Sequence, residues 1–220
     1  PLVCDAGPRR AVPGPAQRVV LIYCMPKGNA KLDLAVRGAT EVGVAAIHLA
    51  VSRRSVARPT AEAFLKRLDR LERIAQEASR QSGRAAVPDL LPPAPLAEVA
   101  ARAPSSARRL VCAPGGGAIP PGGDEAWVVV GPEGGLSDDE LRALEAAGWS
   151  RVSLGETILR TETAATQVRD VTVGIGVGAE HDEQAGAAAH RIGEDIAGLR
   201  VESIDVGQDH QIEAAGRRAR

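Results

Sequence analysis

Apolar positions follow two different periods along the first half of the chain. Continuous apolar runs of the length of buried strands lie at 18–24, 46–51 and 108–112. Between them, apolar residues recur at helical spacing over 30–42 and 60–82. Because strands that alternate with helices pair in parallel, the pattern predicts an open α/β sheet.

Two stretches rich in proline or glycine interrupt this pattern. Residues 85–106 are rich in Pro and Ala, which predicts a surface connection with one short helix near 96–101. Residues 113–123 contain three consecutive glycines, but they lack the Lys-Ser/Thr ending and the capped helix of a phosphate-binding loop. We expect a flexible loop there, close to a ligand site.

The second half of the chain contains a strand that ends in an unusual turn. The apolar run 127–130 stops at five residues that force a sharp turn, in the order Gly131, Pro132, Glu133, Gly134 and Gly135. Ser137 then stands three residues before Glu140, the spacing of a capping box, and Gly148 occupies a position typical of a helix end. A helix is therefore predicted to begin at Ser137.

A second loop follows the alternating strand predicted at 149–154. It covers residues 155–164, where Thr161 or Thr163 could cap a further helix. Both loops follow strands expected to be parallel, so both lie at the edge where open α/β sheets bind ligands. Glycines allow close backbone approach, which suits a nucleoside or nucleoside-like cofactor. The alternative is that residues 131–135 form only a tight turn between strand and helix.

These two loops also carry a family resemblance. The pattern GPEGGLSxxE, followed by LGxxILRxETA, resembles the signature of the RsmE family of SPOUT methyltransferases, which methylate N3 of a uridine in 16S ribosomal RNA. Shorter matches upstream, at 25–28, 39–44, 55–56 and 81–84, extend the resemblance over residues 18 to 168. It implies an open, mostly parallel α/β sheet of the SPOUT type, whose C-terminal part forms a deep trefoil knot.

The resemblance also implies a division of the chain. Members usually begin with a PUA-like β-barrel, and only residues 1–17 precede the first predicted strand, so we expect an irregular N-terminal remnant and no barrel. Residues 18–170 would form the SPOUT methyltransferase domain. Residues 171–220 would form an acidic, loosely ordered tail, because alternating Gly and β-branched residues after Asp170 are poor helix formers.

By this resemblance, the two loops form the knot and hold S-adenosylmethionine. Gly131, Gly134 and Gly155 would permit backbone contact, while Leu154, Ile158 and Leu159 could form an apolar slot for adenine or belong to the ordinary core. The predicted cofactor-binding residues are Gly131, Pro132, Glu133, Gly134, Gly135, Leu154, Gly155, Ile158, Leu159 and Thr163.

The expected reaction restricts the catalytic candidates. Uracil N3 must lose its proton before it attacks a methyl group, so a nearby cation would stabilise the developing negative charge. Arg160 is the candidate for this role, although it could instead pair with Glu162 or Glu133. Glu133 could orient the cofactor's amino groups, act as a base or cap a backbone turn. The family often has an arginine where Thr157 stands, so this chain lacks that second cation.

Charge is unevenly distributed along the chain. The formal net charge is −1, but residues from Asp170 onward carry ten acidic and five basic side chains, which leaves the preceding residues at +4. Residues 52–84 hold nine Lys or Arg against four acids, a plausible phosphate-contacting surface or simply a solvated helix face. The residues predicted to contact RNA are Lys27, Arg53, Arg54, Arg58 and Arg84.

The remaining residues indicate neither metal nor membrane. Cys4, Cys24 and Cys112 lack CxxC spacing, which is typical of reduced thiols in a cytoplasmic protein. His181, His190 and His210 lie beside acids without metal-ligand spacing and are expected to be solvated. No apolar stretch reaches the length of a membrane span or fits a signal peptide.

The predicted function is therefore methylation of uridine N3 in the 16S rRNA of the small ribosomal subunit by a homodimer that uses S-adenosylmethionine. Two alternatives remain open at this point. One is a SPOUT enzyme that acts on another RNA, and the other is a truncated relic that binds S-adenosylmethionine without catalysis.

Overall fold

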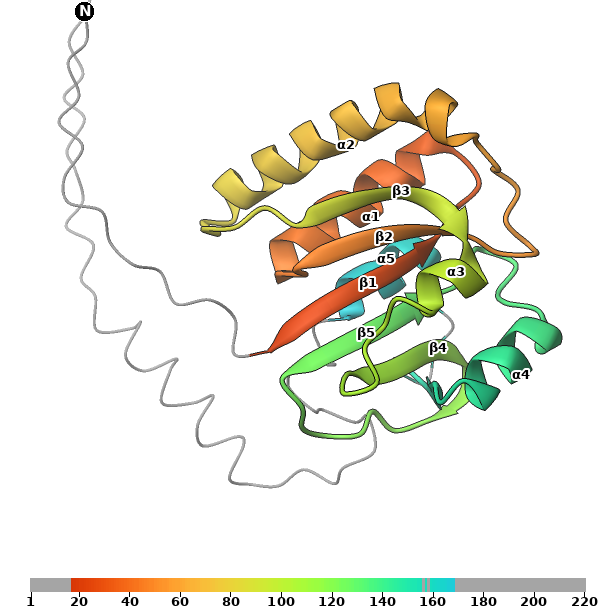
Figure 1. The fold of residues 1–220 in the computed structure, drawn as a ribbon. Coiled ribbons are helices and arrows are strands. Elements are labelled where there is room, and N and C mark those ends of the chain that lie inside the picture. The colour runs from red at the N-terminus through yellow and green to blue at the C-terminus, as the bar shows by residue number, and fades with distance from the viewer. Residues whose placement is uncertain (1–16, 156, 158, 169–220) are drawn as a thin grey trace, which may run out of the picture. The chain divides into compact units, whose positions relative to one another are not determined.

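Six parallel strands form the framework of the part of the chain that the structure describes, which comprises residues 17–155, 157 and 159–168 of a computed structural model (Figure 1). The strands stand in the order β3-β2-β1-β5-β4-β6. Their bounds are β1 Arg18–Cys24, β2 Ala46–Val51, β3 Asp89–Pro95, β4 Arg108–Gly117, β5 Glu125–Val130 and β6 Ser150–Val152. Every pairing is parallel, so the predicted open α/β sheet is confirmed.

Helices cover both faces of this sheet (Figure 1). One face packs against α1 (Asn29–Val42), α2 (Ala61–Gln81) and α5 (Thr161–Gln167). The other face packs against the shorter α3 (Leu96–Ala100) and α4 (Asp138–Ala146). Since the central strands are covered on both sides, they are continuous apolar runs rather than alternating ones.

The two cores are built mainly from aliphatic side chains. Within β1, Leu21 packs on the first face and Ile22 on the second, and both are fully buried. The chain contains one Tyr, one Phe and two Trp, and all four of these aromatic side chains are buried. They are Tyr23, Phe64, Trp127 and Trp149.

Local sequence patterns predicted the ends of several helices and strands correctly. The strands at 18–24 and 46–51 have the predicted bounds, and the first two helices begin and end within one residue of prediction. Ser137 and Glu140 form the predicted capping box at the start of α4. Gly148 has a φ of 84°, the left-handed conformation expected after a helix.

Two expectations for loops were wrong. Residues 89–95, predicted as part of a surface connection, form the edge strand β3, and the short helix follows it at Leu96–Ala100. Proline lacks an N–H donor, but an edge strand pairs on one side only, and the register with β2 shifts between His48 and Ala50. Residues 113–117, predicted as a flexible loop, extend β4 because Gly117 pairs with Val152 of β6.

The ends of the second half also differ from prediction. Strand β5 begins at Glu125 rather than 127, and β6 is limited to Ser150–Val152 rather than 149–154. Neither Thr161 nor Thr163 caps α5, because the helix begins at Thr161 and its N-cap residue is Arg160, which makes no side-chain cap. Instead, the Thr161 hydroxyl accepts a hydrogen bond from the Tyr23 hydroxyl at 3.2 Å.

Several predictions fall on residues outside the described part. They concern Cys4, Ile158, the three histidines at 181, 190 and 210, and the proposed tail at 171–220. The N-terminal remnant at 1–17 is described only at Gln17, and the knot and the domain boundaries stay predictions.

Candidate functional site

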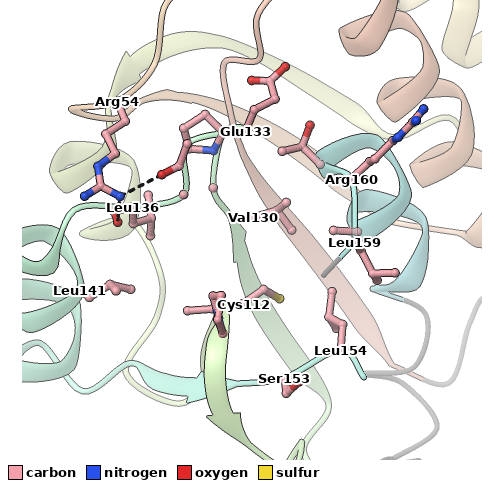
Figure 2. Close-up of a pocket in the computed structure, with 18 of the residues that line it drawn as sticks. Arg54, Cys112, Val130, Glu133, Leu136, Leu141, Ser153, Leu154, Leu159 and Arg160 are labelled. Atoms are coloured by element: carbon pink, nitrogen blue, oxygen red, sulfur yellow. Dashed lines mark hydrogen bonds between the residues drawn. The ribbon is translucent and has the colours of Figure 1, made fainter. Parts of the chain in front are cut away.

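A cavity of about 1000 Å³ opens where β4, β5 and β6 end, at the carboxyl edge of the sheet (Figure 2). Both loops singled out in the sequence line it, together with the end of β4. Its lining includes Val130, Gly131, Pro132, Glu133, Gly134, Gly135 and Leu136 from the first loop, Ser153, Leu154, Gly155, Thr157, Leu159, Arg160 and Thr161 from the second, and Cys112, Ala113, Pro114 and Gly115 from β4. Segments more than 40 residues apart in the sequence therefore share one site.

The first loop reverses direction immediately after β5. The Gly135 N–H donates to the Pro132 carbonyl at 2.8 Å, which closes a tight turn. Gly135 has a φ of 68°, a conformation that favours glycine. The turn then leads directly into the capping box of α4, so the loop is fixed at its far end as well.

Other segments hold this loop from two sides. Arg54, in the connection after β2, donates to the carbonyls of Gly134 and Leu136 at 2.9 and 3.2 Å. On the opposite side, Glu133 accepts the Lys27 backbone N–H at 3.0 Å and pairs with the Lys31 ammonium at 2.7 Å. The loop is thus tied to the ends of both β1 and β2.

The contacts of Glu133 also set its charge state. Burial raises the pKa of its carboxyl group, but hydrogen bonds from Lys31 and from the backbone N–H groups of Glu133 and Lys27 outweigh burial and leave the pKa below its ordinary value. A carboxylate with a lowered pKa is a weak base. The geometry therefore favours the turn-capping alternative for Glu133 over a role as general base.

The second loop supplies aliphatic surface and one cation. Leu154 and Leu159 are partly buried and pack against the core, while the Ser153 hydroxyl donates to the Gly155 carbonyl at 2.6 Å. Arg160 is exposed at the cavity rim, and among the described residues no hydrogen bond or ion pair to its guanidinium is found. Neither Glu162 nor Glu133 pairs with it in the described part of the chain.

The extension of β4 forms a third wall of the cavity. From the sequence, these residues were predicted only to form a loop near a ligand site. The Ser153 N–H donates to the Gly117 carbonyl at 2.9 Å, which joins this extension to the second loop. Cys112 faces the cavity, and burial raises the pKa of its thiol to about 12. Its thiol is therefore protonated at neutral pH, which lowers its reactivity as a nucleophile.

Most predicted cofactor residues line the cavity, and one does not. Nine of the ten are described, and eight of these nine belong to the lining. Thr163 is exposed on α5 outside the lining, where its carbonyl accepts from Thr166. Ile158 lies outside the described residues.

The predicted RNA-contacting residues are distributed over two edges of the sheet. Lys27 is exposed at the carboxyl edge, and Arg53 there pairs with Asp139 at 2.9 Å, with its side chain 69% exposed. Arg58 donates to carbonyls of its own connection. Arg84 lies over Gly43, before β2 begins, and thus at the opposite edge from the cavity.

Four charged lining residues were missed at the sequence level: Lys31, Asp138, Arg151 and Glu162. Lys31 lies in the first turn of the helix after β1, a position that always faces the carboxyl edge and could have identified it. Arg151 pairs with Glu145 at 2.9 Å.

Within the described residues, no cluster of three or more His, Cys, Asp or Glu side chains could hold a metal ion. The described helices include none with the length and apolar character needed to cross a membrane.

Comparison with known proteins identifies related sequences and structures. Residues 13–172 match the family model described as RNA methyltransferase domain. The ribosomal RNA small subunit methyltransferase E of Mycobacterium tuberculosis (strain CDC 1551 / Oshkosh) is 35% identical over 173 residues, and the match covers 71% of this chain and 63% of that protein. The protein of the same name from Mesomycoplasma hyopneumoniae (strain 232) is 30% identical over 154 residues, covering 69% of this chain and 67% of that protein.

Solved structures agree with these sequence matches. The ribosomal RNA small subunit methyltransferase E from Neisseria gonorrhoeae, bound to S-adenosyl methionine, is 33% identical with a TM-score of 0.63, over 70% of this chain and 64% of that one. The putative methyltransferase Lpg2936 from Legionella pneumophila, in complex with bound SAM, is 28% identical with a TM-score of 0.65, over 71% and 66%. This chain thus spans less than two thirds of the length of some relatives.

Proposed function

Because the chain belongs to the RNA methyltransferase domain family, we propose that it transfers a methyl group from S-adenosylmethionine to N3 of a uridine in the 16S rRNA of the small ribosomal subunit. The observation that carries the proposal is the convergence of the two glycine-containing loops on one cavity at the carboxyl edge of the sheet. Relatives named ribosomal RNA small subunit methyltransferase E, one of them solved with S-adenosyl methionine, support it. Since ribosomal subunits are cytoplasmic, the proposal locates the reaction in the cytoplasm.

The lining residues fit this cofactor in size and chemistry. A volume of about 1000 Å³ accommodates a nucleoside with an amino-acid arm. Val130, Leu154 and Leu159 offer aliphatic contact to an adenine ring, and the backbone at Gly131, Gly134 and Gly135 offers polar groups without a Cβ in the way. When bound, S-adenosylmethionine supplies an electrophilic methyl group on a positively charged sulfur.

The chain's own residues then divide the remaining tasks. We assign Arg160 to the negative charge that develops on the uracil ring as N3 loses its proton, because its guanidinium is exposed at the cavity rim and stays charged. Glu133 is assigned to holding the loop rather than to removing the proton, since its lowered pKa makes it a weak base. In Figure 2, both residues lie on one side of the cavity, away from Leu154.

Two measurements test this function. Calorimetric titration with S-adenosylhomocysteine should show saturable binding to the wild-type chain, and unmethylated small subunits should be methylated at a uridine. Arg160→Ala should retain S-adenosylhomocysteine binding within about twofold and lose turnover by roughly 10²–10³-fold. Arg142→Ala is the matched control, because this exposed arginine lies outside the cavity lining and pairs with Asp139, and the variant should leave both properties unchanged.

The outcomes separate the alternatives. A folded chain that binds no S-adenosylhomocysteine would contradict the proposal. Binding with methylation of a different RNA would identify a SPOUT enzyme with another target, and binding without any methylation would identify a relic. Full activity of Arg160→Ala would remove that residue from the mechanism. The proposal includes a homodimer, which sedimentation equilibrium would test directly.

A further inference from the structure

Arg54 reaches across from the connection after β2 to the loop that lines the cavity. Its guanidinium donates to the Gly134 carbonyl at 2.9 Å and to the Leu136 carbonyl at 3.2 Å (Figure 2). Its stem also runs beside this loop, since a Cβ added at Gly134 would lie 3.6 Å from the Arg54 Cβ. Both parts of the side chain therefore lie against the loop.

These two contacts complete the fixation of two peptide units. In the first, the Gly134 carbonyl is held by Arg54 and the Gly135 N–H by the Pro132 carbonyl. In the second, the Leu136 carbonyl is held by Arg54 and the Ser137 N–H by the Glu140 carboxylate at 2.9 Å. A peptide plane held at both ends has one orientation, so the loop backbone is arranged before any ligand binds.

The side chains of the neighbouring Arg53 and Arg58 do not bind the carbonyls of this loop. Arg53 pairs with Asp139 on the surface, and Arg58 donates to the carbonyls of Ser52 and Arg53 in its own connection. Neither residue belongs to the cavity lining, whereas Arg54 does. Both hydrogen bonds come from one guanidinium nitrogen, Nη1, whose two N–H groups have fixed directions in the guanidinium plane. A lysine side chain is one bond shorter, so its ammonium would not reach both carbonyls in the same geometry.

We propose that Arg54 is a positioning residue for the cofactor loop rather than a ligand of RNA phosphates. It fixes the carbonyls of Gly134 and Leu136 and thereby keeps the loop in the conformation that binds the nucleoside. The inference rests on the proposed function, because it names the group that prepares the same site. It replaces the prediction from sequence that Arg54 contacts RNA.

The test measures two affinities in the full chain. Arg54→Met removes the guanidinium and keeps much of the stem. It should weaken S-adenosylhomocysteine binding about tenfold while affinity for small-subunit RNA changes less than twofold. Arg54→Lys, which keeps the charge, should recover only part of the cofactor affinity and guards against a misfolded first variant. Arg142→Met is the matched control, because this exposed arginine pairs with Asp139 outside the cavity lining, and it should change neither affinity. In turnover assays, the KM for S-adenosylmethionine should rise more than kcat falls.

The possible results are distinguishable. Weaker RNA binding with unchanged cofactor binding would overturn the inference and make Arg54 a phosphate ligand. Unchanged affinities for both would overturn it as well, as would full recovery of cofactor affinity in Arg54→Lys. Absence of S-adenosylhomocysteine binding by the wild-type chain would instead count against the proposed function.

Discussion

Gly38 allows α1 and α5 to approach each other closely, and one added methyl group probes that contact. A Cβ at this position would lie 2.2 Å from the Thr166 Cγ2 atom, well inside van der Waals contact. Thr166 cannot rotate its methyl group away without losing the hydrogen bond from its hydroxyl to the Thr163 carbonyl at 2.6 Å. Overpacking of this kind costs about 1–3 kcal/mol in free energy of unfolding.

The intrinsic preference of a helix for alanine acts in the opposite direction. Alanine is favoured over glycine in a helix interior by about 0.8–1.0 kcal/mol, so Gly38→Ala alone should destabilise the chain by about 1 kcal/mol net. In a Thr166→Ser background the clashing methyl group is absent, and the nearest remaining atom would be the Cβ at 3.6 Å, an ordinary contact. There, Gly38→Ala should stabilise by about 1 kcal/mol.

The assay is a double-mutant cycle by urea denaturation or thermal melting. The expected coupling of about 2 kcal/mol corresponds to a difference of roughly 4–8 °C in Tm for a chain of this size. A coupling within about 0.5 kcal/mol, with alanine stabilising in both backgrounds, would refute the close contact between α1 and α5.

Three further predictions concern the strand extension, the α4 cap and the cavity thiol. Gly116→Ala would place a Cβ 2.3 Å from the Val152 carbonyl carbon, so thermal melting should show a loss of about 1–3 kcal/mol in free energy of unfolding. Gly117→Ala is the control, because a Cβ there would meet open space and should cause no such loss. Burial raises the pKa of Glu140 but its hydrogen bonds lower it further, below the ordinary 4.5. Glu140→Gln should therefore cost stability at pH 7, and urea titrations should show this difference from wild type shrinking as pH falls below that value. Cys112, with a pKa of about 12, should react with iodoacetamide at pH 8 roughly 10³-fold more slowly than a free thiol, and rapid labelling, followed by mass spectrometry, would contradict the raised pKa.

Sequence patterns gave the elements whose signals are local. The apolar runs at 18–24 and 46–51 define strands because both of their faces are buried, and Ser137 marks a helix start through contacts with its own neighbours. The strand at 89–95 could not be recognised in this way. Its prolines at 92, 93 and 95 argue against a strand unless the strand is known to lie at a sheet edge, and that position depends on the tertiary fold.

In the candidate site, too, features with local signals were predictable and features that depend on tertiary packing were not. Glycine-rich loops after two strands were sufficient to predict which residues surround the cavity, because parallel strands bring their carboxyl ends to one edge. The hydrogen-bond and ion-pair partners of the arginines could not be predicted from the sequence. Arg54 and Arg53 are adjacent in sequence, yet one donates to loop carbonyls and the other pairs with Asp139, which is decided by how the connection after β2 lies against the start of α4.

The burial of every aromatic ring has a consequence for how an RNA base could be held. Proteins that grip unpaired bases commonly stack them on exposed Phe, Tyr or Trp side chains. This chain has four such side chains, and all of them lie in its two cores. A uracil presented to the cavity would therefore be held at its edges by hydrogen bonds and on its faces by aliphatic or guanidinium groups. Selectivity among bases would then come from the pattern of donors and acceptors rather than from stacking strength.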